Sequence, residues 1–240
     1  KHADIALSAG NTGAMLVISR LILNTISGIS KPALAGLWPN EKNMNLVLDL
    51  GANIECNEKN LVDFACMGSA LFKSLFDKEI PKIALLNVGL EEHKGSEVLK
   101  NAFSILKKNK ANNFEFCGYI EGSQIMNGDI DVIITDGFTG NIALKTAEGT
   151  ANFIVENFKK SLNKLSLLIS YRSLNKLKKR LDPRKFNGAI FLGLQSPVVK
   201  SHGSTDAVGF AHSIDVCSKV IKANLIEKIK SHLINVDASV

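Results

Sequence analysis

A lysine and a histidine stand close together in one glycine-bounded stretch, residues 200–203 (KSHG). Histidine exchanges protons near neutral pH, and a lysine ammonium can stabilise a developing oxyanion. A further lysine, Lys145, comes one helical turn after Asn141, where we expect a helix to begin. That spacing predicts an ammonium near the preceding glycine-rich loop, with an ordinary surface lysine as the alternative. The predicted catalytic residues are Lys145, Lys200 and His202.

Five glycine-bearing stretches each follow a predicted strand: residues 8–13, 49–53, 87–89, 136–141 and 200–204. Glycine lets backbone N–H groups approach an anion, and a helix start adds unpaired donors. In an open parallel sheet, the loops after the carboxyl ends of the strands line the ligand crevice. We therefore expect one shared anion-binding cleft. For Asp136, the alternative role is to cap its own loop. The predicted substrate-binding residues are Asn11, Thr12, Gly13, Asn53, Asp136, Gly140 and Asn141.

Several standard catalytic motifs do not occur in the sequence. It contains neither GxxxxGK[ST] nor GxGxxG, which argues against a P-loop NTPase and a standard dinucleotide-binding fold. It also lacks a GxSxG elbow and an HExxH motif, which argues against serine hydrolases and zincins.

Short apolar runs alternate with helix-length segments along most of the chain. Strands are predicted at residues 5–8, 33–38, 46–50, 83–87, 114–119, 132–135 and near 189–194. Helices are predicted at residues 12–25, 58–76, 96–108, 141–158 and 206–222. Continuous apolar runs such as residues 132–134 are typical of strands buried on both faces. The alternation predicts a mainly parallel sheet with helices on both sides, in a single α/β domain over residues 1–240.

Positive charge is concentrated in one segment. The formal net charge is +6, but residues 159–185 alone hold ten Lys or Arg and a single Asp. Leucines recur there at helical spacing with a change of phase near Ser170, which predicts an inserted basic hairpin of two short amphipathic helices. One interpretation is a solvated basic face over a packed apolar stripe, and the other is an anchor on an anionic membrane. The predicted membrane contacts are Leu174, Lys176, Leu177 and Arg180.

The motifs resemble those of the acyl-carrier-protein:phosphate acyltransferase (PlsX) family of bacterial phospholipid synthesis. The resemblance extends from about residue 4 to residue 210. It rests on blocks in order at residues 8–14, 49–53, 85–89, 136–141, 145, 148–149, 187–189, 192–194 and 200–203. The family's opening strand and Met-Gly-Gly-Asp turn do not occur, so we expect that an amino-terminal part is missing.

The resemblance implies a fold, a reaction and partners. The fold would be a three-layer α/β/α sandwich, similar to phosphate acetyltransferases and isocitrate dehydrogenases, and the protein would form a homodimer. The reaction would transfer a fatty acyl group from acyl carrier protein to inorganic phosphate, with neither cofactor nor metal. The product would pass to a membrane-bound glycerol-3-phosphate acyltransferase, which implies a cytoplasmic protein at the membrane surface, touching it through the basic hairpin.

The resemblance also implies roles for the candidate residues. The loops at Asn11, Asn53 and residues 140–141 would cradle phosphate, and Lys145 would offset its charge. Lys200 and His202 would polarise the thioester carbonyl or protonate the leaving thiolate.

Three other functions remain as alternatives. A phosphate acetyl- or butyryltransferase would use an acyl-CoA donor instead of acyl carrier protein. A non-catalytic protein could bind an anionic membrane or nucleic acid through the basic hairpin, although one Trp and two Tyr make a stacking surface for nucleic acid a poor fit. An NAD-dependent dehydrogenase of the related fold would need an acid-rich metal site, which the sequence does not suggest.

Overall fold

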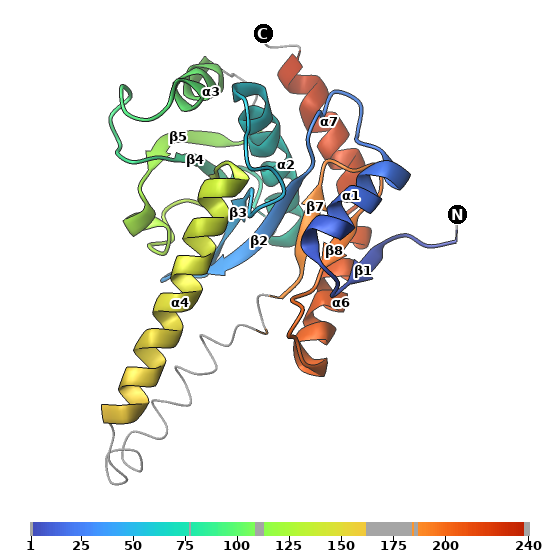
Figure 1. Ribbon diagram of the computed structural model, residues 1–240. Coiled ribbons are helices and arrows are strands. Elements are labelled where there is room, and N and C mark those ends of the chain that lie inside the picture. Colours follow the sequence, from blue (N-terminus) through green and yellow to red (C-terminus); the bar gives the residue numbers. More distant parts are fainter. Residues whose placement is uncertain (1, 77, 109–112, 162–183, 185–186, 238–240) are drawn as a thin grey trace.

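The computed structural model describes residues 2–76, 78–108, 113–161, 184 and 187–237, and Figure 1 shows their arrangement. The strands are β1 (Ala6–Ser8), β2 (Ala33–Pro39), β3 (Met44–Leu48), β4 (Lys82–Leu86), β5 (Glu115–Ile120), β6 (Val132–Ile134), β7 (Ala189–Leu192) and β8 (Val198–Lys200). The helices are α1 (Thr12–Leu23), α2 (Glu58–Phe76), α3 (Glu97–Lys108), α4 (Gly137–Ser161), α6 (Ala207–Lys222) and α7 (Leu225–Asp237), with a 3-10 turn, η1, at Gly122–Gln124.

The strands form one sheet in the order β1-β8-β7-β2-β3-β6-β4-β5. Neighbours pair in parallel at β1–β8, β3–β6, β6–β4 and β4–β5. The pairs β8–β7, β7–β2 and β2–β3 are antiparallel. The predicted mainly parallel sheet is confirmed. Because of the antiparallel pairs in its middle, β1 and β8 run in the opposite direction to β3, β6, β4 and β5.

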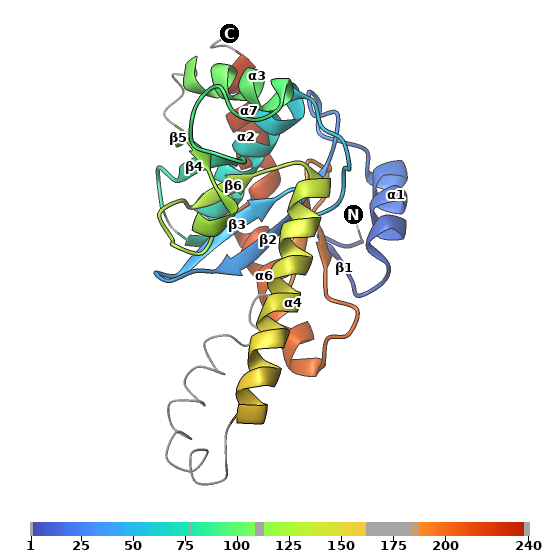
Figure 2. The ribbon, with the colours of Figure 1, turned by 60° about the vertical axis from the view of Figure 1, so that its left-hand side comes forward.

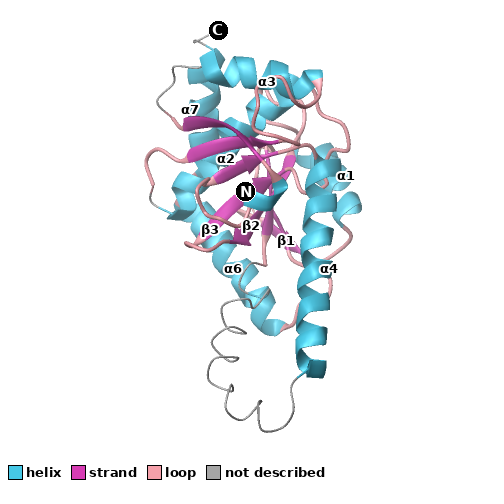
Figure 3. Ribbon diagram, turned by 90° about the vertical axis from the view of Figure 1, so that its left-hand side faces the viewer, coloured by secondary structure: helices cyan, strands magenta, loops and turns pink. Residues whose placement is uncertain are grey.

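Helices cover both faces of this sheet, which makes the three layers visible in Figures 2 and 3. Strand residues alternate between the two faces, so Leu46 and Leu48 join one apolar cluster while Val47 joins the other. The first cluster contains buried residues of α2, α3, α6 and α7. The second includes partly buried side chains of α1 and α4. The predicted α/β/α sandwich is therefore confirmed.

Element boundaries follow the sequence pattern closely, with three differences. The helix predicted at residues 58–76 matches α2, but α4 begins at Gly137 and not at residue 141. The cause is Asp136, whose Oδ1 accepts a hydrogen bond from Thr139 N at 2.8 Å and so caps the helix one turn earlier. Strand β8 and helix α7 were not predicted, and the apolar run of β8 has only two residues, Val198 and Val199.

The predicted basic hairpin falls mostly outside the described residues. Its first residues, 159–161, form the end of α4, which descends beyond the sheet in Figure 1. The predicted membrane contacts Leu174, Lys176, Leu177 and Arg180 lie outside the described part of the chain. Within the described part, no helix has the length and apolar character needed to cross a membrane.

Candidate active site

The five glycine-bearing loops do not line one cleft, contrary to the sequence-based expectation. Strand β8 ends at Lys200, which pairs with Ala189 at the start of β7. Strand β7 ends at Leu192, which pairs with Ala33 at the start of β2. Strand β3 leaves the sheet at that second edge, where Leu50 N donates to the carbonyl oxygen of the β2 residue Leu34 at 2.9 Å. The loops after β1 and β8 therefore lie at one edge of the sheet, and those after β3, β4 and β6 lie at the opposite edge.

The β3–β6 loop cluster, defined as residues 49–53 and 135–141, is organised around the carboxylate of Asp49. This side chain is fully buried. Its Oδ1 accepts from the amides of Leu34, Gly51 and Ala52 at 2.9–3.1 Å. Its Oδ2 accepts from the backbone and side-chain nitrogens of Asn53, both at 2.8 Å. Burial raises the pKa of Asp49, and the hydrogen bonds counteract that rise.

Glycines allow the two loops of this cluster to touch backbone to backbone. Gly137 N donates to Asn53 O at 2.7 Å, and a Cβ at Gly137 would lie 2.4 Å from that oxygen. A Cβ at Gly140 would lie 2.0 Å from Asp49 O. Since real Cβ atoms do not approach so closely, this contact accounts for the glycine at position 140 without a ligand.

The other predicted substrate-binding residues of this cluster bond within it. Asp136 accepts from the backbone nitrogen and Oγ1 of Thr139, at 2.8 and 2.9 Å, so it caps α4. Asn141 Nδ2 lies 3.4 Å from Leu50 O. Asn53 Nδ2 also donates to Pro32 O at 2.7 Å. These polar groups hold the loops together.

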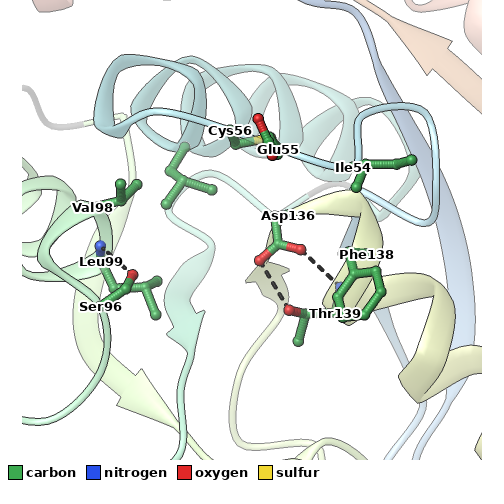
Figure 4. A pocket seen from close by; sticks show the side chains of 10 residues that line it. Ile54, Glu55, Cys56, Ser96, Val98, Leu99, Asp136, Phe138 and Thr139 are labelled. Atoms are coloured by element: carbon green, nitrogen blue, oxygen red, sulfur yellow. Dashed lines mark hydrogen bonds between the residues drawn. The ribbon is translucent and has the colours of Figure 1, made fainter.

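A cavity of about 340 Å³ lies beside this cluster, between the amino-terminal ends of α2, α3 and α4 (Figure 4). Its charged lining residues are Glu55 and Asp136, both acidic, and their negative charges oppose the phosphate that helix starts would otherwise favour. It also contains Cys56, whose pKa is raised to about 11, first by burial and then by the nearby Asp49. Because Cys56 is then a neutral thiol, it is a poor nucleophile.

The β1–β8 loop cluster, defined as residues 8–13 and 200–204, occupies the opposite edge of the sheet. Ser201 N donates to Ser8 O at 2.9 Å and joins its two loops. Asn11 Oδ1 accepts from Ala14 N at 3.0 Å, so Asn11 is the N-cap of α1. The amino-terminal end of α1, with Thr12 and Gly13, thus lies next to the Lys-Ser-His-Gly stretch.

Lys200 and His202 differ in their surroundings. Lys200 is buried, its Nζ donates to Ser201 O, and burial lowers the pKa of its ammonium group. The His202 side chain is exposed. Its backbone nitrogen donates to Asn187 Oδ1 at 2.8 Å, and its ring Nδ1 lies 2.9 Å from Ser204 Oγ.

Comparison with known proteins identifies the family. The sequence model of a family described as "Fatty acid synthesis protein" matches residues 1–228. A phosphate acyltransferase of Pelagibacter ubique is 58% identical over 97% of this chain, and the match covers 72% of that protein. This chain belongs to the phosphate acyltransferase family. A second member, from Sinorhizobium fredii, is 44% identical over 97% of the chain and 68% of its own length.

Solved structures of similar fold are phosphotransacetylases. The EutD phosphotransacetylase from Staphylococcus aureus has a TM-score of 0.59 at 15% identity. The match covers 92% of this chain and 63% of that protein. A phosphotransacetylase from Streptococcus pyogenes has a TM-score of 0.58 at 20% identity. The match covers 94% of this chain and 64% of that protein. This likeness concerns the fold. The predicted acyltransferase activity, which moves an acyl group to phosphate in lipid synthesis, is confirmed by the family.

In this phosphate acyltransferase, Lys145 is not at the start of α4. It lies about two turns beyond Gly137 and pairs with Glu148 Oε2 at 2.8 Å on the exposed surface. The premise that placed its ammonium beside the glycine-rich loop, a helix beginning at residue 141, was wrong. Its predicted catalytic role stays a prediction.

Asn187, which lies next to the β1–β8 loop cluster, was not among the predicted site residues. Asn187 Nδ2 faces Ser201 Oγ, Thr205 Oγ1 and Gly209 O, each at 2.9 Å. Together with the bond to His202 N, these contacts connect the segment before β7 to the loop after β8. The Asn-Gly pair at residues 187–188 was a possible signal, although an Asn-Gly pair more often marks a simple turn.

Proposed function

We propose that this phosphate acyltransferase takes a long-chain acyl group from the thioester of acyl carrier protein and transfers it to inorganic phosphate. The observation that carries the proposal is the 58% identity to a phosphate acyltransferase over 97% of the chain. The donor is our inference from the resemblance of the motifs. The acyl phosphate product would then be consumed by a membrane-bound glycerol-3-phosphate acyltransferase.

We place the reaction at the β1–β8 loop cluster. This edge combines the buried Lys200 and the exposed His202 with the amino-terminal end of a capped helix, α1, a favourable setting for phosphate. Positioning of phosphate against the thioester carbonyl would supply much of the rate. The β3–β6 loop cluster, in contrast, has acidic side chains at its cavity.

A CoA thioester is the main alternative acyl donor within this reaction class. The phosphotransacetylase-like fold is the observation that favours a CoA thioester donor. Acyl carrier protein is acidic, so the basic segment at residues 159–185 could steer it by charge. The same segment could bring the enzyme to an anionic membrane, which is our proposal for its peripheral association.

We also propose a homodimer. Exposed apolar side chains support this proposal, because large apolar patches on a soluble protein mark contact surfaces. On α1 these are Val17, Ile18, Leu21 and Ile22, and on α4 they are Phe153, Ile154, Val155 and Phe158. Light scattering coupled to size-exclusion chromatography tests the proposal, and a monomer at micromolar concentration contradicts it.

The decisive experiment measures phosphate-dependent product formation. The protein is incubated with long-chain acyl carrier protein and phosphate, acyl phosphate is trapped with hydroxylamine, and acyl-CoA replaces the donor in a second sample. The full-length Pelagibacter ubique relative serves as a parallel enzyme. We expect hydroxamate only when phosphate is present, and more from acyl carrier protein than from acyl-CoA. Preference for acyl-CoA would reject the proposed donor, and no product from either donor would reject the proposed function.

A further inference from the structure

His202 has two hydrogen-bond donors directed at the same ring nitrogen. The backbone nitrogen of Ser204 lies 3.3 Å from His202 Nδ1, and Ser204 Oγ lies 2.9 Å from it. A backbone N–H can only donate, so Nδ1 must accept. The hydroxyl can donate to the same lone pair, since its hydrogen rotates freely. Ser204 therefore opposes a proton on Nδ1.

The proton of the neutral ring is then fixed on the other nitrogen. A neutral imidazole carries one N–H, and the partner of one nitrogen sets the state of the other. With Nδ1 as acceptor, the hydrogen of His202 lies on Nε2. Among the described residues none forms a hydrogen bond with Nε2, and the side chain is exposed, so this N–H is available to a substrate.

Hydrogen bonds of the backbone hold the loop that carries His202. His202 N donates to Asn187 Oδ1 at 2.8 Å, and Thr205 N donates to His202 O at 3.1 Å. The neighbouring residue Ser201 is tied to Ser8 O of the loop that precedes α1. With the backbone of the loop held and Nδ1 contacted by Ser204, the direction of the Nε2–H bond is set relative to the amino-terminal end of α1.

We infer that Ser204 is a positioning residue that holds His202 as a neutral Nε2–H hydrogen-bond donor to the thioester carbonyl oxygen. This inference rests on the proposed function. It selects one of the two roles considered for His202, polarising the carbonyl, over giving a proton to the leaving thiolate. A neutral imidazole is a good hydrogen-bond donor but a very weak acid.

The reaction balances without a proton from His202. An oxygen of hydrogen phosphate attacks the thioester carbonyl carbon, and as the new C–O bond forms the carbonyl π electrons move to oxygen. The Nε2–H donates to this oxyanion. The electron pair then returns, the C–S bond breaks, and the thiolate takes the proton that hydrogen phosphate brought. Acyl thioester and hydrogen phosphate thus become acyl phosphate and thiol.

Two matched replacements of His202 separate donation from proton transfer. His202→Gln keeps an N–H near the position of Nε2 but cannot titrate, and His202→Leu keeps neither property. We expect a loss of turnover of about 100-fold or more in the leucine variant, the usual effect of removing one oxyanion donor, and of about 10-fold or less in the glutamine variant. Equal losses in the two variants would overturn the inference.

A spectroscopic measurement tests the tautomer of His202 independently of enzyme activity. Nitrogen-15 NMR of the histidine rings is recorded at about pH 8.5, above the usual range of histidine titration, and His202 is assigned by its absence in His202→Gln. We expect a protonated Nε2 and an unprotonated Nδ1. In Ser204→Ala the Nδ1–H form should become detectable and turnover should fall a few-fold, whereas Ser204→Thr, which keeps the hydroxyl, should resemble the wild type. A protonated Nδ1 in the neutral wild-type ring would overturn the assigned tautomer. No spectral change in Ser204→Ala would overturn the role of the Ser204 hydroxyl, because that variant keeps the backbone N–H.

The two measurements also separate this inference from the proposed function. If the wild-type protein makes no acyl phosphate while its His202 shows the expected tautomer, the proposed function fails and the role of Ser204 in setting the tautomer stands. If product forms but the glutamine variant is as inactive as the leucine variant, the function stands and the donor role fails.

Discussion

The β3–β6 and β1–β8 loop clusters look alike in sequence and differ in what their polar groups do. Each combines glycine with asparagine after a strand. In the β3–β6 loop cluster, five donors converge on the buried carboxylate of Asp49, and the loops bond to each other. In the β1–β8 loop cluster, His202 stays exposed beside the start of α1. Glycine and asparagine therefore indicate close backbone approach, which packing between loops can explain without a ligand.

The largest expected effect on stability is that of Asp49→Asn. The free energy of unfolding should fall by about 3 kcal/mol, because the new NH2 group must face N–H donors in a buried site. Urea denaturation followed by Trp38, the only tryptophan and a buried one, measures the loss. The matched control is Asp136→Asn. Among the described residues the hydrogen-bond partner of the Asp136 side chain is Thr139, and the side chain is partly exposed, so the loss should be about 1 kcal/mol or less. Equal losses would contradict the difference between the clusters.

His202→Ala should show the opposite behaviour. Turnover should fall about 100-fold, equivalent to about 2.7 kcal/mol of activation free energy. The free energy of unfolding should change by less than about 0.5 kcal/mol, because the side chain is exposed. His93→Ala, an exposed histidine in the loop after β4, is the control and should leave turnover unchanged. If His202→Ala loses stability instead of turnover, the β1–β8 loop cluster is as structural as the other.

Asn11 tests whether a cap residue also faces phosphate. Asn11→Ala should lower the free energy of unfolding by about 1 kcal/mol, because α1 loses its N-cap. Asn11→Asp keeps the cap but adds a negative charge, so stability should be retained while the KM for phosphate rises. An unchanged KM in Asn11→Asp would place phosphate elsewhere.

The smallest change is expected for Lys200→Met, and its sign depends on pH. Burial lowers the pKa of Lys200, so the folded state binds this proton less tightly than the unfolded state does. The stability that this difference contributes is present above the ordinary lysine pKa and is lost as the pH falls through the folded-state pKa. Lys200→Met should therefore gain stability relative to wild type at pH 7, and the gain should shrink in alkaline solution. Lys145→Met, which removes an exposed lysine, is the matched control for the gain at pH 7.

Much of the fold could be predicted because its signals are local. The apolar run at residues 132–134 and the helical pattern at residues 58–76 both became the expected elements, β6 and α2. The predicted start of α4 was wrong by four residues. Asp136 caps the helix, whereas Asn141 contacts Leu50 O, and the sequence alone does not show which of the two side chains has another partner. Strand β8 was missed because its apolar run has only two residues, Val198 and Val199, whereas that of β6 has three.

The sequence by itself determined the α/β class, the family and the set of polar residues near glycines, because these follow from residue type and short-range spacing. Only the tertiary structure decided which of those residues meet. The antiparallel pairs β8–β7, β7–β2 and β2–β3 send the two groups of loops to opposite edges of the sheet. Strand direction depends on pairing between segments far apart in the chain, and local patterns of hydrophobicity are the same for a strand running either way.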